Sequence, residues 1–168
     1  MEKAALKEHR RHSTADKPFS YYISNIPEYF PNAPMHWHKE FELNVILEGE
    51  GDFVTGDIHF TAYKGDIVLT PPDMLHAVYQ HDDKRCVYDT LDLDGSMLGS
   101  RDNDRAADAF ITPLISGAYS IETHITPEHC YYSELLTTAE NMINAAKGDT
   151  PLPVSYTHLR AHETDQYL

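Results

Sequence analysis

The chain has 168 residues, enough for one domain with a hydrophobic core and some attached segments. Its 27 acidic residues outnumber its 13 basic residues, which gives a net charge of −14. Because no basic cluster is long enough to follow a phosphate backbone, we expect no nucleic-acid binding by this chain itself.

The N-terminal sequence MEKAALKEHRRH is charged and lacks the apolar core of a signal peptide. No apolar run approaches the roughly 20 residues that a membrane helix needs. The two cysteines, Cys86 and Cys130, are expected to be free and reduced, although sequence alone leaves a single bridge open. These features predict a soluble, cytoplasmic protein without a membrane partner.

Residues 1–17 are expected to form a mobile or weakly helical arm. Short runs of strand-forming residues then follow one another without intervening helices, and a loop with three prolines leads into His36. This order predicts an antiparallel sandwich or barrel. The predicted strands cover residues 18–23, 42–47, 51–54, 58–63, 67–70, 76–80 and 85–93.

Two short motifs place three histidines and a glutamate in a pattern typical of a ligand cluster. The first, H-x-H-x3-E, contains His36, His38 and Glu42. Alternate residues of a strand share a face, so the two histidines can converge. A straight strand would carry Glu42 about 13 Å beyond His38, so the chain must turn near residues 39–40. The second motif, G-x5-P-x-D-x2-H, brings His76 from a third strand.

The two motifs resemble those of the cupin superfamily nearly position for position, over residues 31–80. The resemblance implies a mainly β cupin fold, a double-stranded β-helix or jelly-roll barrel, here with C-terminal α-helices. Two positions depart from the family pattern: Asp73 stands where the second motif usually has glycine, and Gln80 where it often has asparagine. Neither is expected to be a metal ligand, and the departures weaken an enzyme interpretation more than the fold.

The cluster has two interpretations. Imidazole and carboxylate ligands suit a divalent transition metal such as Zn, Fe, Mn or Ni. Alternatively, as the resemblance to regulator-type members implies, the same side chains line a pocket that binds an organic effector directly, without a metal. The candidate metal ligands are His36, His38, Glu42 and His76, and Tyr88 joins them as a candidate effector contact.

Other aromatic and imidazole side chains are weaker candidates. A tyrosine on a strand can line a pocket or pack in the core, and this applies to Tyr21, Tyr22 and Tyr79. The remaining histidines of the barrel and helix regions are expected to be exposed or structural: His59, His81, His124 and His129.

After residue 100 the pattern changes from strands to helices. A short helix is predicted over 102–110 and an isolated strand over 119–125. The clearest helix covers 126–147, with Thr126 at its N-cap and a Lys-Gly pair at its end. Its apolar residues recur at steps of three and four, which predicts packing against the outside of the β-domain; a helix–helix dimer contact is the alternative.

A cupin barrel followed by such helices resembles the N-terminal effector domain of AraC-type transcription regulators. The segments FITPLISG, at 110–117, and ITPEHCYYSELLTTAENMINAAKG, at 125–148, look like the helical part of that domain. The resemblance implies binding of a small-molecule effector, a sugar or similar polar metabolite, and homodimer formation through the C-terminal helices. In that family two helix-turn-helix units further along the chain bind DNA, and no such units are present in this sequence.

The tail, residues 154–168, resembles a translated reading frame of a common transposase-type sequencing adapter. We therefore predict that it did not evolve for a fold and that the natural gene continues beyond Pro153. His158 and His162 stand four residues apart, a spacing that otherwise suggests a metal site, but the adapter accounts for both.

The predicted organisation is an effector-binding barrel at 18–100 followed by a helical segment at 101–150. Three functions are compatible with it. The helical extension favours the sensing and dimerisation domain of a bacterial AraC-type regulator, which is not an enzyme and has no certain cofactor. The complete ligand set favours a small metal-dependent cupin enzyme of the isomerase or dioxygenase type. A carbohydrate-binding module is the third interpretation.

Overall fold

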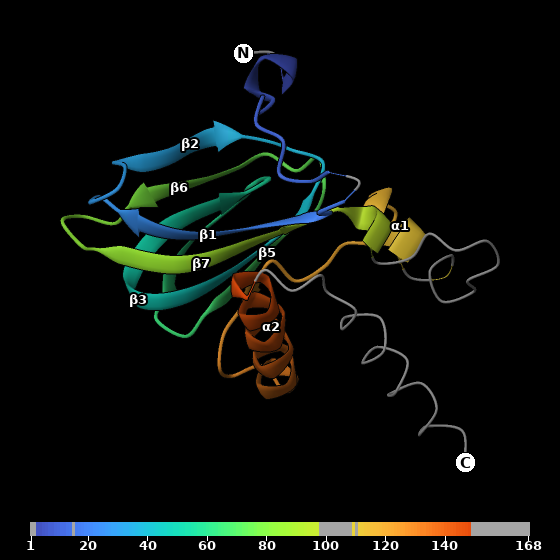
Figure 1. Ribbon diagram of the computed structural model, residues 1–168. Coiled ribbons are helices and arrows are strands. Elements are labelled where there is room, and N and C mark those ends of the chain that lie inside the picture. The colour runs from blue at the N-terminus through green and yellow to red at the C-terminus, as the bar shows by residue number, and fades with distance from the viewer. Residues whose placement is uncertain (1–2, 15, 98–108, 110, 149–168) are drawn as a thin grey trace.

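The computed structural model describes residues 3–14, 16–97, 109 and 111–148. Its strands form two facing sheets, and the longest helix lies against the outer face of one of them (Figure 1). The strands are β1 (Phe19–Ile26), β2 (Asn32–His36), β3 (Phe41–Thr55), β4 (Ile58–Tyr63), β5 (Ile67–Thr70), β6 (His76–Gln80), β7 (Cys86–Leu93) and β8 (His124–Ile125). The helices are α1 (Thr112–Ile115), α2 (Tyr132–Lys147) and the 3-10 turns η1 (Lys3–Leu6) and η2 (Gly95–Met97).

The two sheets share the long strand β3. Its first part pairs with β7 and β5 in the order β1-β7-β3-β5-β8, and its second part pairs with β4 and with β6, which in turn pairs with β2. The strand passes from one sheet to the other near Gly49, which has φ 74°. A Cβ at Gly49 would lie 1.7 Å from the carbonyl oxygen of Arg85, so only glycine fits this crossing. The result is the predicted mainly β jelly-roll cupin fold with a C-terminal helix.

Most predicted strands are confirmed, and two details are wrong. The predicted strands 42–47 and 51–54 are one continuous strand, β3, because the glycine-rich crossing bends the chain without breaking its pairing. The proline-containing loop before His36 ends in the strand β2 instead. Pro34 is tolerated there because β2 is an edge strand, paired with β6 alone among the described strands.

The predicted helix starts at Tyr132 and not at Thr126. The amide of Thr126 donates to the Nδ1 atom of His129 at 3.0 Å, and this contact holds residues 126–131 in turns before the helix begins. The end at Lys147, capped by Gly148, is as predicted. The predicted strand at 119–125 is reduced to β8, and the predicted helix at 102–110 and the tail at 154–168 lie outside the described residues.

The apolar stripe of α2 packs against its own barrel, as predicted. It covers the outer face of the sheet formed by β1, β7, β3 and β5, and its buried residues are Ala139, Ile143 and Ala146. A second core fills one end of the barrel interior, with Ile26, Ile46 and Phe53 among its members. The other end of the interior contains polar side chains.

Two smaller predictions can be compared with the structure. Cys86 is buried, Cys130 is exposed, and both are free. Among the described residues, no helix is long and apolar enough to cross a membrane.

Candidate effector and metal site

The four motif residues meet at the polar end of the barrel interior. Ligand atoms of His36, His38, Glu42 and His76 all lie within 4.8 Å of one another. His36 ends β2 and pairs in register with His76, which begins β6. His38 lies in the connection after β2, and the chain bends at residues 39–40 so that Glu42 returns at the start of β3. The turn that the motif spacing requires is therefore present.

The carboxylate of Glu42 is at the centre of this cluster. Its Oε2 atom lies 3.3 Å from Nε2 of His38 and 3.4 Å from Nε2 of His76. Its Oε1 atom accepts a 2.7 Å hydrogen bond from the side-chain amide nitrogen of Asn44. The side-chain oxygen of Asn44 in turn accepts a 2.7 Å hydrogen bond from the hydroxyl of Thr90. This buried chain of hydrogen bonds fixes the orientation of Glu42 before any ligand arrives.

The charges of the cluster are set by competition between burial and pairing. Burial alone would raise the pKa of Glu42, but the His76 charge and hydrogen bonds from His38 and His76 hold it well below its usual value. Burial lowers and the Glu42 charge raises the pKa of His76, and the net direction is up. For His36, burial and the neighbouring His76 charge lower the pKa. An anionic carboxylate is thus held between histidines with different proton affinities.

The four residues fit a divalent transition metal. The Nδ1 atoms of His36 and His76 donate to the carbonyl oxygens of Pro34 and Met74, at 2.7 Å and 2.9 Å. Such donation orients metal-binding histidines and leaves Nε2 as the ligand atom. The Nε2 atom of His76 is buried and faces the Glu42 carboxylate, with Oε2 at 3.4 Å. A metal held here would act as a Lewis acid for oxygen atoms of a bound molecule.

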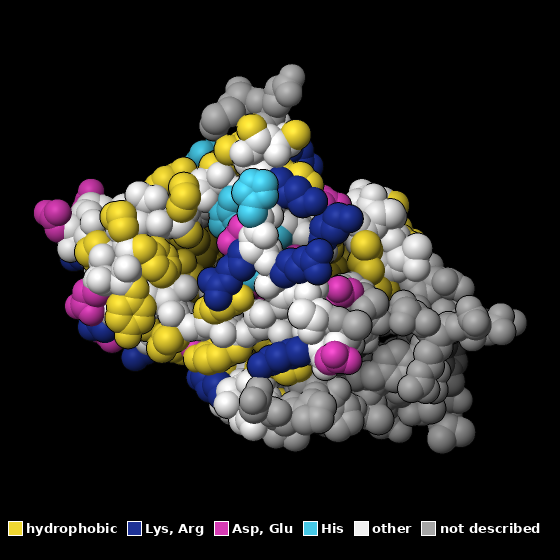
Figure 2. All heavy atoms as spheres, turned by 45° about the horizontal axis from the view of Figure 1, so that its top comes forward, with side chains coloured by type: hydrophobic (Ala, Val, Ile, Leu, Met, Phe, Trp, Pro, Cys, Tyr) yellow, Lys and Arg dark blue, Asp and Glu magenta, His cyan; other side chains and the backbone are white. Residues whose placement is uncertain are grey.

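A cavity of about 460 Å³ adjoins the cluster, and three cluster residues line it: His36, Glu42 and His76. The aromatic side chains of Tyr22, Tyr88 and Phe30 form part of its wall. Figure 2 shows imidazole side chains at the centre of this face of the molecule, with Lys and Arg side chains beside them. The volume is typical of cavities that hold a small organic molecule.

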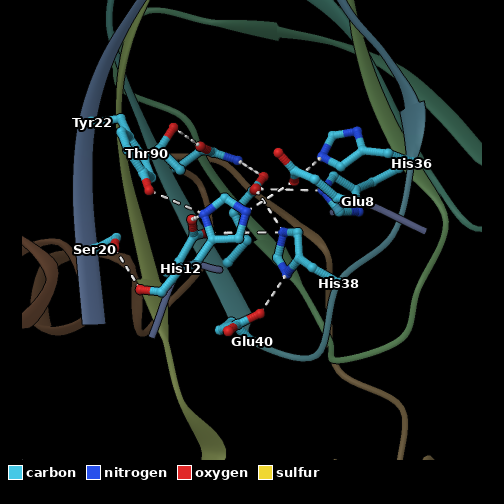
Figure 3. A network of polar contacts seen from close by, with 12 residues as sticks. Glu8, His12, Ser20, Tyr22, His36, His38, Glu40 and Thr90 are labelled. Carbon is cyan, nitrogen blue, oxygen red and sulfur yellow. Dashed lines mark hydrogen bonds and ion pairs between the residues drawn. The ribbon is translucent and has the colours of Figure 1, made fainter. Parts of the chain in front are cut away.

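The N-terminal arm contributes residues that sequence reasoning missed. The sequence predicts only a mobile or weakly helical arm, but beyond the turn η1 the chain pairs with Trp37 and enters the barrel mouth. Glu8, Arg10 and His12 line the cavity. The His12 side chain is 7% exposed, and Figure 3 shows its imidazole between Tyr22 and His38.

His12 pairs with a second missed residue, Asp92 of β7. Its Nδ1 atom lies 2.7 Å from Oδ2 of Asp92, and its Nε2 atom lies 2.9 Å from Oε2 of Glu8. Although burial lowers the pKa of His12, the hydrogen bonds that its imidazole donates to both carboxylates raise it to about 11. Burial and the Glu42 charge raise the pKa of Asp92. Both directions favour keeping a proton on the pair at neutral pH.

Of these two missed residues, Asp92 could have been found from the sequence pattern. Tyr88, Thr90 and Asp92 alternate along β7, and all three line the cavity, so a period of two starting from the candidate Tyr88 leads to Asp92. His12 has no such signal, because no motif or periodicity ties the arm to the barrel.

The remaining candidates lie away from the cluster. Tyr21 points to the outer face, where its hydroxyl donates to Asp89 at 2.6 Å, and Tyr79 is 37% exposed. The other predicted structural or exposed histidines have these roles: His59 is exposed, His81 pairs with Asp52, His124 pairs with Asp66, and His129 binds the turn at Thr126.

Asp73, one of the two departures from the second motif, has a backbone conformation that glycine adopts readily. Its φ is 61°, in the left-handed region that aspartate tolerates better than most residues. Its amide donates to the carbonyl of His38 at 2.8 Å, which links the second motif to the first. An aspartate is therefore compatible with the backbone of this turn.

Comparison with known proteins gives the family of the chain. Residues 18–101 match the model of the AraC-like ligand binding domain, and the chain belongs to that family. It is 27% identical over 89 residues to an uncharacterized HTH-type transcriptional regulator of Bacillus subtilis, a match that spans 52% of this chain but 31% of the regulator.

Solved structures with a similar arrangement include those of two proteins. A cupin protein from Bacteroides fragilis is 18% identical, with 51% of this chain and 73% of that chain covered and a TM-score of 0.44. A predicted oxalate decarboxylase from Thermotoga maritima is 21% identical, with 45% and 67% covered and a TM-score of 0.41.

Proposed function

We propose that this chain is the effector-sensing and dimerisation domain of an AraC-type transcription regulator, and that its effector is a sugar or similar polar metabolite. The observation that carries the proposal is the cavity, because it combines the polar cluster at one end with aromatic and apolar walls. A polar metabolite with a carbon skeleton matches both kinds of wall.

Binding can be tested with the single tryptophan of the chain. Trp37 stands between His36 and His38, and its indole donates to the carbonyl of Lys3 at 2.7 Å, so its fluorescence reports on the site. We expect at least one polar metabolite from a screened set to change this fluorescence and raise the Tm, and Thr90→Val to weaken the binding. A screened set without any saturable response would contradict the sensor function.

The proposal includes a homodimer formed through the C-terminal helices. The apolar stripe of α2 packs against the barrel of the same chain. We therefore expect the dimer contact on the exposed face of α2, which carries Thr137 and Asn141. Replacing Thr137 by arginine places a long charge on this face without touching the core. We expect sedimentation to show a dimer that dissociates in this variant, whereas a monomer of the unaltered chain would contradict the contact.

DNA binding belongs, in this proposal, to a longer protein. The regulator from Bacillus subtilis extends well beyond the matched region, and the net charge of −14 argues against binding of a duplex by this chain. We expect no duplex binding by the 168-residue chain at physiological salt, which a mobility-shift measurement checks. Sequence-selective, salt-sensitive binding of DNA by this chain would contradict the proposal that a longer protein is needed for it.

A metal-dependent enzyme is the second candidate, favoured by the three histidines and one glutamate that converge within 4.8 Å. Elemental analysis of untagged protein determines whether a metal is bound. Incubating the loaded protein with a bound molecule, followed by NMR of that molecule, then separates the two functions. Recovery of the unchanged molecule supports a sensor, and turnover supports an enzyme.

A further inference from the structure

Asp92, which lines the cavity beside the motif cluster, has one unpaired carboxylate oxygen. Asp92 has a side chain that is 1% exposed, and its Oδ2 atom pairs with His12 at 2.7 Å. Its Oδ1 atom is buried and has no hydrogen-bond partner among the described residues. The Nε2 atom of His38 lies 4.0 Å from it, beyond hydrogen-bond distance. A buried acceptor left without a donor destabilises the protein unless something else donates to it.

The place of Asp92 in the sheet makes this arrangement costly. In the β3–β7 register Asp92 lies directly opposite Glu42, so two buried acidic side chains are cross-strand neighbours. Like charges at such positions are unfavourable, and a small apolar residue would avoid both the repulsion and the unpaired oxygen. His12 compensates only one oxygen. A ligand group that donates to the other oxygen best explains a carboxylate at this position.

We propose that Asp92 is a specificity residue of the cavity, and that it selects effectors which present a neutral hydroxyl group at this point. His12 is the positioning residue that holds Oδ2 and leaves Oδ1 facing the ligand. This inference rests on the proposed sensor function and narrows its ligand class.

The same geometry discriminates against acids. A ligand carboxylate next to Oδ1 would be a third negative group beside Asp92 and Glu42, and it would bring no proton to donate. A ligand ammonium would satisfy Oδ1 as a hydroxyl does, so an amine is the other source of a donor. The cationic ring of His12 lines the cavity next to Asp92 and repels a ligand ammonium. It therefore favours a neutral hydroxyl over an amine as the donor to Oδ1.

The test uses three matched ligands: glucose, glucosamine and glucuronate, with the galactose series as a second set. Affinities for the unaltered 168-residue chain are measured by Trp37 fluorescence and calorimetry. We expect a neutral sugar to bind at least about tenfold more tightly than its uronic acid, the size expected for one hydrogen bond to a charged group. The amino sugar should bind more weakly than the neutral one.

Asp92→Asn tests the residue itself, and Asp52→Asn is the control. Asp52 also pairs with a histidine, since its Oδ1 lies 2.8 Å from His81, but it is on the surface outside the cavity. We expect Asp92→Asn to abolish most of the preference for the neutral sugar over the acid, and Asp52→Asn to leave it unchanged. His12→Gln should reduce that preference without removing it, a change that a purely structural role would not cause.

The outcomes separate this inference from the proposed function. Tight binding of the acid but not of the neutral sugar, or a preference unaffected by Asp92→Asn, overturns the role of Asp92 and leaves the sensor function standing. Failure of every neutral, amino and acidic sugar to bind overturns the inference and counts against the sugar-sensing function as well. If Asp92→Asn does not fold, the neutral-to-acid ratio of the unaltered chain decides alone.

Discussion

The two faces of the sheet formed by β3 and β7 have opposite chemistry. Residues that point outward, toward α2, are apolar, whereas those that point into the barrel at its open end are polar and mostly buried. The outward set is Leu43, Val45, Leu91 and Leu93, and the inward set is Glu42, Asn44, Thr90 and Asp92. The contrast indicates that the helix-covered face supplies stability, whereas the interior gives up stability to keep binding groups in place.

The largest expected effect separates these two faces. Leu91 is fully buried in the core under α2, so Leu91→Ala should lower the free energy of unfolding by about 2–5 kcal/mol through lost burial and a cavity. Ligand or metal affinity of the folded fraction should not change. Urea denaturation measures the effect, with Ile58→Ala, at a 53% exposed position, as the near-neutral control. Equal losses of unfolding free energy in the two variants would contradict the stabilising role of the outer face.

His38→Ala is expected to give the opposite result. It removes one of four clustered ligand groups, so metal affinity should fall by more than about 100-fold, because loss of even a group that only orients a ligand costs about 10–100-fold. Stability without metal should change far less than in Leu91→Ala. Titration with Zn²⁺ or Mn²⁺ provides the measurement, and His81→Ala removes an imidazole outside the cluster as the control. Metal binding that survives His38→Ala would argue for the metal-free pocket.

A smaller effect concerns pH. The lowered pKa of Glu42 contributes stability that is present above its unfolded value of 4.5 and is lost as the pH falls below it. The raised pKa of His76 contributes stability that is present below 6.5 and is lost as the pH rises through the folded value. Without metal, the stability difference between the unaltered chain and Glu42→Gln should therefore be largest between these two values. A difference that is constant with pH would contradict the pairing.

The sequence predicts the two faces unequally well. The motif spacing leads to the cluster, and the helical period of 126–147 leads to the apolar face of α2. The helix start was wrong because residues 126–131 form turns, in which the amides of His129 and Tyr132 donate to the carbonyls three residues back and the His129 side chain accepts from the Thr126 amide. His12 could not be found, because its contact with Asp92 joins residues 80 positions apart and depends on how the arm crosses the barrel mouth. Tertiary contacts of this kind leave no local pattern.

The smallest expected effect concerns a charged pair at the border between the faces. Asp89 lies on the outer face of β7 between two cavity-lining residues, and its buried carboxylate accepts hydrogen bonds from Lys147 at 3.0 Å and Tyr21 at 2.6 Å. Burial lowers but the pairing with Asp89 raises the pKa of Lys147, with a net rise. Because the lysine side chain is 42% exposed, solvent screens the pair.

Lys147→Met should therefore cost about 1 kcal/mol, mainly by leaving the buried carboxylate with Tyr21 alone. Asp89→Asn should cost less, since a neutral amide can still accept from Tyr21. Combining both changes should cost little more than Asp89→Asn, because the lysine has no buried charge left to compensate. Urea denaturation of the three variants gives the coupling energy. Strictly additive losses would show that the pair does not fasten the end of α2 to the sheet.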